Sequence, residues 1–313
     1  RVPAIEMRVL KQLIDSQERR ASNDDPRPIF LTRAADQSLY AQRVADQTEL
    51  TALDRAIDDP NFAQFLSPDE RLLLLTTEYT CYVKTAAELA DLSENSLALA
   101  DLEGFRADAF GREYVYSLAR WQGLQAAEQI IVMSSLGYVH SYSGQAFLER
   151  ISQPIAYKVA RSRGYPATLV AAQSDHDYVA VTHAGRAARI PISKLTLREQ
   201  RLLSVPLKGN IVGAIAGDNE MEFIVATASG YAGRWTIGTI PPVADMNTTG
   251  HKLTNRSNPI IAMPYYADAQ LFALTNQRIT PIKQGITPFD LSDYRLLKLK
   301  NGERLLTLFY TEV

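Results

Sequence analysis

Short apolar runs, each closed by a Thr or Ser, recur along most of this chain and are separated by turn-forming residues. Such runs are typical of β-strands that are buried on at least one face. In the clearest copies, residues 178–189 and 223–234, an apolar strand ends in Thr, a tight turn follows, and a second strand carries Arg. The six copies are anchored on Thr32, Thr77, Ser134, Thr182, Thr227 and Thr275. Spacings of 45 to 57 residues between these anchors predict an array of similar supersecondary units.

Each unit is predicted to form one four-stranded blade, and three of its strands can be placed in the sequence. The first is apolar, as in residues 168–172, 211–215 and 260–263, and a polar turn connects it to the strand that ends in Thr or Ser. Three residues after the Thr or Ser, a glycine such as Gly185 allows the positive backbone dihedral angle of a tight hairpin. Short strands at regular spacing are found in sandwiches, barrels and propellers, and six units of one size favour a ring of blades.

The two ends of the repeat array differ from its middle. The first unit begins at Pro28 without an apolar strand before it, and the apolar residues 305–310 follow the last unit. We expect this last strand to complete the first blade, because a closed ring leaves no open sheet edge. The connecting segments 49–63 and 85–99 are predicted to be partly helical.

The first 27 residues are predicted to form a separate helical segment. Ile5, Val9 and Leu13 recur at helical spacing, and a polar, proline-containing stretch follows them. The domain organisation expected is therefore an N-terminal helix and linker at 1–27 and an all-β ring at 28–313.

Composition narrows the class of protein. Apolar residues make up 46% of the 313, which is enough for a large core, and a single cysteine, Cys81, excludes an intramolecular disulfide. No apolar run reaches the roughly 18 residues of a membrane helix. We expect a cytoplasmic protein without a membrane partner.

The net charge of −2 hides an asymmetry. Residues 1–127 hold 14 Lys and Arg against 21 Asp and Glu, whereas residues 128–313 hold 19 against 14. This difference favours a positive surface on the later units, which suits a polyanion. Ordinary scatter of charge over a solvated surface is the alternative.

Signatures of enzyme and metal sites are absent from the sequence. It contains no zinc-type spacing of Cys and His, no phosphate-binding glycine loop and no Gly-x-Ser-x-Gly elbow. The acidic and histidine run at Asp175, His176 and Asp177 lies in a predicted polar turn. No cofactor, metal or catalytic residue is expected.

The repeat resembles a known family. In residues 181–194 the turn glycine Gly185 is followed by Arg189 four residues later and then by an apolar-Pro step, and several units share this register. The pattern is similar to the C-terminal β-pinwheel domain of the A subunits of DNA gyrase and topoisomerase IV, over residues 28–313. The resemblance implies a six-bladed β-pinwheel that acts as a DNA-binding accessory module beside topoisomerase catalytic subunits. It also implies nonspecific binding of duplex DNA on a basic outer rim.

The sequence departs from the family in two ways. The family members that wrap DNA chirally carry Gln-Arg-Arg-Gly-Gly-Lys-Gly in a loop between blades, and the nearest string here, residues 198–204, lacks the glycines. The family's catalytic domain, with its DNA-cleaving tyrosine, is also missing, so this chain is not expected to be an enzyme. We therefore expect DNA bending over part of the rim without a complete chiral wrap. The alternative is a protein-interaction propeller that has lost DNA binding.

Basic residues in the hairpins and in the linking loops are the candidate DNA contacts, because cations that neutralise phosphates release condensed counterions. Ser141 stands where the other units have a basic residue, so the stripe is predicted to be interrupted there. The candidate DNA-binding residues are Lys84, Arg186, Arg189, Lys194, Arg198, Arg201, Lys208, Arg234, Lys252 and Arg256.

Overall fold

A computed structural model describes residues 25–44, 57, 60, 62–94, 113–151, 157–205, 210–253, 258–282 and 294–311. The helix predicted at residues 4–20 and most of the segment 49–63 lie outside this described part. None of the helices in these ranges is long and apolar enough to cross a membrane.

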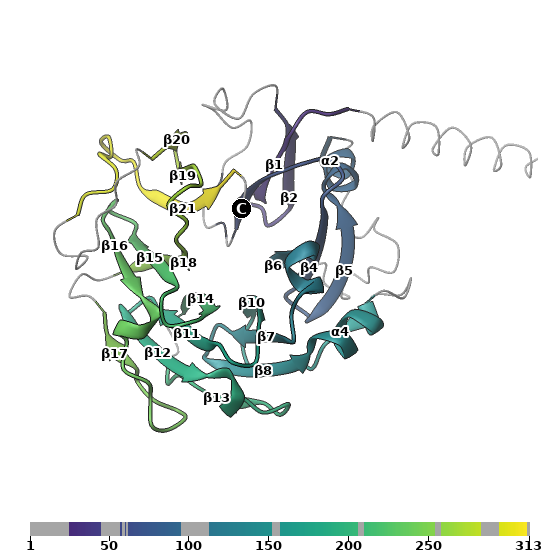
Figure 1. Ribbon diagram of the computed structural model, residues 1–313. Helices are drawn as coiled ribbons and strands as arrows, with labels where there is room; N and C mark the ends of the chain where they lie inside the picture. The colour runs from purple at the N-terminus through teal and green to yellow at the C-terminus, as the bar shows by residue number, and fades with distance from the viewer. Residues whose placement is uncertain are drawn as a thin grey trace, which may run out of the picture.

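Six antiparallel sheets are arranged as blades around a ring (Figure 1), which confirms the predicted all-β ring. The strands of each blade are given from one sheet edge to the other. Blade 1 consists of β2 (Leu39–Arg43), β1 (Ile29–Arg33) and β3 (Ala63–Leu66), and blade 2 of β6 (Val115–Arg120), β4 (Arg71–Thr76), β5 (Thr80–Thr85) and β9 (Tyr157–Lys158). Blade 3 consists of β10 (Pro166–Ala172), β7 (Gln129–Ser134), β8 (Tyr138–Ser143) and β13 (Gln200–Arg201). Blade 4 consists of β14 (Ile211–Gly217), β11 (Asp177–Thr182), β12 (Arg186–Pro191) and β17 (His251–Lys252). Blade 5 consists of β16 (Ala232–Thr236), β15 (Glu222–Thr227) and β18 (Pro259–Pro264), and blade 6 of β20 (Ile279–Pro281), β19 (Leu271–Thr275) and β21 (Leu305–Tyr310).

Short helices lie in the connections between strands. They are α2 (Ala86–Glu94), α3 (Trp121–Gln125), α4 (Gly144–Ile151) and the 3-10 turns η2 (Ile192–Lys194) and η3 (Ile237–Thr239). Helix α2 confirms the helix predicted within 85–99, whereas α3 and α4 were not anticipated from the sequence.

The inner strand of each blade follows the central hairpin in the sequence. Strand β10 pairs with β7, β14 with β11 and β18 with β15. These inner strands line a central channel of about 290 Å³. The apolar segments 168–172, 211–215 and 260–263 are thus strands, as predicted, but each belongs to the preceding unit. The polar turns after these strands therefore connect one blade to the next. The boundary between units was misplaced because a repeat period gives the length of a unit but not the residue at which it begins.

A further strand at the outer edge comes from the chain that leaves the next blade. Strand β9 follows the hairpin of blade 3 and yet pairs with β5 of blade 2. In the same way β13 pairs with β8, and β17 pairs with β12. Figure 1 shows β13 and β17 at the periphery of the ring. Neighbouring blades are therefore linked by exchanged strands as well as by packing.

The prediction that the last strand completes the first blade is wrong. Strand β21 pairs with β19 of blade 6, and blade 1 takes its inner strand from β3. Because every inner strand follows its own hairpin, the C-terminal strand is already used within the last blade. Blades 1 and 6 meet instead through a cluster of phenylalanine rings. The Phe30–Phe309, Phe65–Phe309 and Phe65–Phe272 centroids lie 5.6, 5.5 and 5.8 Å apart.

Blades 2 to 4 have four strands, whereas blades 1, 5 and 6 have three. In blade 1, helix α2 packs beside β2, in the place that the fourth strand has in blades 2 to 4. Its small residues Ala86, Ala87 and Ala90 are buried and let the helix lie close to the sheet, in a cluster that includes Leu31 and Ala41. The helix begins with a capping box. The Glu88 side chain accepts a hydrogen bond from the Thr85 amide at 2.8 Å, and the Glu88 amide donates to the Thr85 hydroxyl at 3.2 Å.

The Thr or Ser that closes the first hairpin strand binds the turn. The Thr182 hydroxyl accepts the amide of Arg186, four residues later, at 3.3 Å, and the equivalent bonds at Ser134, Thr227 and Thr76 measure 3.2 Å. The bond at Thr76 shows that the second unit is anchored one residue before Thr77. In the first unit the last hairpin pair is Arg33 with Leu39, which places Ala34, two residues after Thr32, at the anchor position.

Glycine in this turn holds the exchanged segment. Gly137 has a φ of 83°, and its carbonyl accepts the amides of Leu202 and Leu203 at 2.9 and 3.2 Å. A Cβ atom on Gly137 would lie 2.3 Å from the Leu203 carbonyl oxygen. The position therefore needs glycine for its backbone angle and for the close approach of the neighbouring segment.

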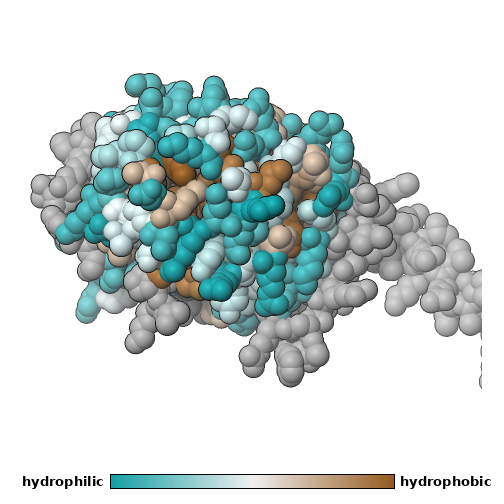
Figure 2. Space-filling model, turned by 90° about the horizontal axis from the view of Figure 1, so that it is seen from below, coloured by the Kyte–Doolittle hydropathy of each residue, from teal (hydrophilic) through white to brown (hydrophobic). Residues whose placement is uncertain are grey.

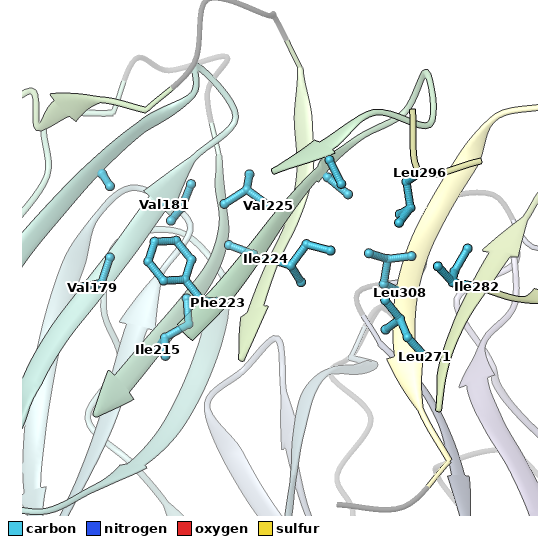
Figure 3. Close-up of a cluster of buried hydrophobic side chains, with 14 of the residues drawn as sticks. Val179, Val181, Ile215, Phe223, Ile224, Val225, Leu271, Ile282, Leu296 and Leu308 are labelled. Carbon is cyan, nitrogen blue, oxygen red and sulfur yellow. The ribbon is translucent and has the colours of Figure 1, made fainter. Parts of the chain in front are cut away.

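Between blades, the side chains of adjacent sheets interdigitate. Figure 3 shows Val181 of blade 4 and Phe223 of blade 5 among the buried side chains, with Leu271 and Leu308 of blade 6 farther along the cluster. Each of these residues is at least 95% buried. The core of the protein is thus distributed between the blades around the ring, and the stability of each blade depends on its neighbours.

A buried carboxylate just before β21, that of Glu303, binds the hairpin turn of blade 6. The Glu303 side chain accepts hydrogen bonds from the Arg278 guanidinium, the Thr275 hydroxyl and the Lys300 amide, at 2.8, 2.9 and 2.7 Å. Burial raises the pKa of Glu303, but the hydrogen bonds from Arg278, Lys300 and Thr275 lower it by more, to about 2.

Three glycine substitutions separate the cost of a positive φ from the cost of a steric clash with the neighbouring segment. We expect Gly137→Ala to destabilise the protein by about 3 kcal/mol, because it adds a steric clash to an unfavourable φ. Gly302→Ala, with a φ of 72° and nothing within 4 Å, should cost about 1 kcal/mol. Gly123→Ala, in helix α3, should stabilise by about 0.5 kcal/mol. Urea unfolding measures all three, and equal effects of the first two would rule out the clash.

Acid should weaken the fold through Glu303. Because its pKa is about 2 in the folded protein and near 4.5 when unfolded, the stabilisation is present above the unfolded value and is lost as pH falls toward 2. The loss should approach about 3 kcal/mol. Glu303→Gln should flatten the dependence of unfolding free energy on pH in this window, whereas the exposed control Glu220→Gln should not. Parallel pH curves for wild type and Glu303→Gln would contradict this assignment.

Candidate nucleic-acid interface

The basic residues that follow the turn glycines pair with carboxylates inside their own blades. The Arg189 guanidinium lies 2.8 and 2.6 Å from Asp177 Oδ2 and also donates to the Ile240 carbonyl at 3.0 Å. Arg234 Nε lies 3.3 Å from Glu222 Oε1, and the guanidinium lies over the Tyr265 ring. The exposed fractions of the two arginine side chains are only 13% and 17%. Both arginines therefore hold two hairpin strands together.

Ser141 occupies the same position in blade 3 as Arg189 and Arg234 in theirs. Its hydroxyl donates to Gln129 Oε1 at 2.6 Å. This serine and glutamine form a neutral version of the charged pairs in blades 4 and 5. The apparent interruption of the basic stripe at Ser141 thus reflects a change in an internal pair.

Two other candidates are also bound within the protein. The Arg186 guanidinium donates to the carbonyls of Thr249 and Gly250, at 2.8 and 2.7 Å, and so fixes the loop before β17. Lys84 Nζ lies 3.3 Å from Glu88 of α2. Lys84 is near the end of β5, away from the hairpin turn of that blade.

The remaining candidates differ in exposure. Lys194, Arg198 and Lys252 are exposed, and Arg201 is half-buried. Lys208 and Arg256 lie outside the described residues. For all ten candidates, DNA contact remains a prediction.

Four cations occupy one equivalent position in four successive blades. Lys158 pairs in register with Thr80, Arg201 with Tyr138 and Lys252 with Arg186, and Arg295 forms a bridge to Tyr231. Each hairpin partner stands four residues after the Thr or Ser of its turn. We call Lys158, Arg201, Lys252 and Arg295 the outer basic row.

Lys158 and Arg295 were not among the candidates expected from the sequence. The signal that marks this position is a basic residue followed by an apolar one, at Lys158–Val159, Arg201–Leu202, Lys252–Leu253 and Arg295–Leu296. Hairpin alignment alone cannot reveal it, because these segments pair with a blade earlier in the chain. Their register becomes visible only when the exchanged strands are known.

A denser group of cations lies beside blade 3. The guanidinium carbons of Arg163 and Arg201 are 5.6 and 5.5 Å from the centroid of the Tyr138 ring. The Ser162 hydroxyl donates to Glu199, which joins loop 161–165 to the loop that carries Arg198. We call Arg161, Arg163, Arg198 and Arg201, with Tyr138, the basic–aromatic cluster.

The rim, seen from below the view of Figure 1, is mainly hydrophilic (Figure 2).

Acidic neighbours reduce the field of this cluster only in part. Arg161 lies 3.3 Å from Glu78, but its side chain is 65% exposed, so the pair is screened by water and contributes little. His140 Nε2 faces Glu199 at 3.7 Å, and burial lowers the pKa of this histidine. The imidazole is thus held neutral near physiological pH and adds no charge.

Within the described ranges, no group of His, Cys, Asp and Glu is arranged to hold a metal ion. Asp177, from the polar run noted in the sequence, is the partner of Arg189. Cys81 is buried, and burial raises the pKa of its thiol above the usual range.

The sequence matches no protein-family model and no curated protein. Two solved structures are similar to the whole ring. The DNA gyrase A C-terminal domain has a TM-score of 0.64 at 13% sequence identity, covering 91% of this chain and 100% of that one. The C-terminal domain of DNA topoisomerase IV has a TM-score of 0.59 at 14% identity, covering 92% and 94%. The similarity shows that this chain has the β-pinwheel fold.

Arg189 and Lys194 should behave differently when truncated. Arg189→Ala leaves the mostly buried Asp177 without its cation, so we expect a loss of about 3 kcal/mol in unfolding free energy. Lys194→Ala removes an exposed cation and should change stability by less than about 0.5 kcal/mol. Thermal and urea unfolding give both values. A loss below about 1 kcal/mol for Arg189→Ala would show that the pair contributes little to the blade.

Proposed function

We propose that this chain is a DNA-binding module that holds duplex DNA against the outer basic row and the basic–aromatic cluster. The observation that carries the proposal is the recurrence of one cation at the same position in blades 2, 3, 4 and 5. Solubility requires charged residues on a surface, but it does not require one cation in register on successive blades. A row of this kind matches a ligand whose own charges repeat along its length.

The chemistry of the row suits phosphate contacts without sequence readout. Lys158, Lys252 and Arg295 are exposed and can exchange water for phosphate oxygens. Affinity would come from counterion release and would be sequence-independent. None of the described helices exceeds nine residues, and each lies in a connection between strands.

The position of the row limits how far DNA would follow the ring. Helix α2 takes the place of a fourth strand in blade 1, and no equivalent cation is described in blade 6. DNA that contacts blades 2 to 5 must bend, at a cost of several kcal/mol for a tight arc, which the successive contacts offset. We infer bending over part of the rim without a complete chiral wrap.

The fold shared with the gyrase A and topoisomerase IV C-terminal domains supports an accessory role for this module beside the catalytic subunits of a type IIA topoisomerase. In that role the chain holds DNA, and the catalytic subunits cut and rejoin it. Catalysis is not assigned to the described residues.

A triple variant and a double control test the row. Lys158→Gln, Lys252→Gln and Arg295→Gln together remove three exposed cations at the turn end of the blades. Arg27→Gln and Arg71→Gln together remove two exposed cations from the opposite ends of blades 1 and 2.

Binding of a short duplex of arbitrary sequence is followed by fluorescence anisotropy at several salt concentrations. We expect the rim variant to reduce the slope of log affinity against log salt by roughly 2 to 3, and the control to change it by less than about 1. Equal slopes for the two variants would show that the row is not the site. Salt-insensitive binding, or none, would favour a protein-interaction propeller.

A further inference from the structure

One large aromatic side chain stands out of the surface beside the basic–aromatic cluster. Tyr165 is 48% exposed and ends loop 161–165, directly after Arg163 and Gly164. Its backbone is fixed, because its amide donates to the Ser135 hydroxyl at 3.1 Å and its carbonyl accepts the Ser135 amide at 2.7 Å.

The ring of Tyr165 is also fixed from one side. It stacks on Tyr116 with ring centroids 5.3 Å apart and an interplanar angle of 26°. Tyr116 is only 9% exposed, and the Arg33 guanidinium carbon lies 5.5 Å from its ring centroid. Tyr114 packs beside the same two rings, with its centroid 6.2 Å from Tyr116 and 6.5 Å from Tyr165, and the Arg33 guanidinium carbon lies 5.0 Å from its centroid. Arg33, Tyr114, Tyr116 and Tyr165 therefore form a continuous cation–aromatic stack from blade 1, through blade 2, to the loop before β10. The stack ends in solvent at Tyr165.

The glycine before the ring makes this arrangement possible. Gly164 has a φ of 86°, and a Cβ atom at this position would lie 2.5 Å from the Ser135 hydroxyl oxygen. Glycine adopts this turn without strain, and the turn presents Tyr165 outward with Arg161 four and Arg163 two residues before it. Packing alone does not require a half-exposed ring here.

We propose that the free face of Tyr165 stacks on an unpaired DNA base while the adjacent arginines bind the flanking phosphates. The inference rests on the proposed function, since it takes DNA as the ligand of the rim. Stacking of bases on aromatic rings is tolerant of sequence, and it is usually accompanied by cations that follow the backbone. A nucleobase would extend the existing stack by one more ring.

The geometry favours an unpaired base over insertion into an intact duplex. A side chain that intercalates needs both of its faces between two base pairs, but one face of Tyr165 is covered by Tyr116. A ring with one free face can only end a stack. The module should therefore bind locally unpaired or bulged DNA more tightly than fully paired DNA of the same length and charge.

The test compares two short duplexes that contain 2-aminopurine, one with this base paired and one with it as a single-nucleotide bulge. For the wild-type chain we expect about tenfold tighter binding of the bulged duplex. The 2-aminopurine emission of the bulge should fall on binding, because stacking on the phenol ring quenches it. Equal affinity for the two duplexes, or unchanged emission, would overturn the proposal.

Variants assign the effect to the ring. Tyr165→Phe should keep the preference for the bulge, whereas Tyr165→Leu should abolish it and leave binding of the paired duplex unchanged. Leu197→Ala removes the other exposed large apolar side chain, which is 74% exposed, and should keep the preference. A preference that survives in Tyr165→Leu, or that disappears in Leu197→Ala, would contradict stacking on Tyr165.

The same measurements separate this inference from the proposed function. The paired duplex could bind through the outer basic row without any preference for the bulge. That result would support the proposed function and contradict only the stacking on Tyr165. Absence of binding to either duplex would overturn both.

Discussion

The architecture depends on one repeated hydrogen bond between neighbouring units. The carbonyl of the turn residue in blades 2 to 5 accepts an amide from the chain that returns from the next blade, at 2.9 to 3.1 Å. The donors are Val159, Leu202, Leu253 and Leu297, and the acceptors are Tyr79, Gly137, Gly185 and Gly230. A positive φ at each acceptor turns its carbonyl outward, toward the incoming segment. The turn thereby fixes the outer strand and, with it, the cation that this strand carries to the rim.

Basic residues serve two distinct purposes on the same blades, and the partners of each side chain decide which. Arg189 and Arg234 meet carboxylates on the adjacent strand, so their charges are neutralised within the blade. Lys252 and Arg295 lie one strand farther out and remain exposed. The positive balance of residues 128–313 therefore overstates the charge available to a ligand, since part of it is committed to internal pairs. The field at the rim comes from fewer residues, which lie in a more regular register.

The sequence was sufficient for the ring and its hairpins, because both depend on local pattern. An apolar strand that ends in Thr or Ser and is followed by a turn glycine, as at Thr182 and Gly185, indicates a hairpin from local sequence alone. The sequence did not reveal that β10 belongs with β7 or that β21 stays within blade 6, because these pairings join segments 30 to 43 residues apart. The same limit applies to the site. Arg189 matched the expected motif but lies inside the blade, whereas Lys158 is not part of any hairpin and lies on the rim.

Strand exchange also determines what a single repeat can do by itself. The stretch from β11 to β14 contains the hairpin and inner strand of blade 4, but it also carries β13, which belongs to blade 3. Its own outer strand, β17, lies beyond the following hairpin. One repeat expressed alone would therefore contain β13, which has no partner strand there, and would lack β17, the outer strand of its own blade. Duplication or loss of a unit during evolution preserves the ring only where the flanking repeats can accept a new neighbour's strand, which favours ancestral copies that were nearly identical.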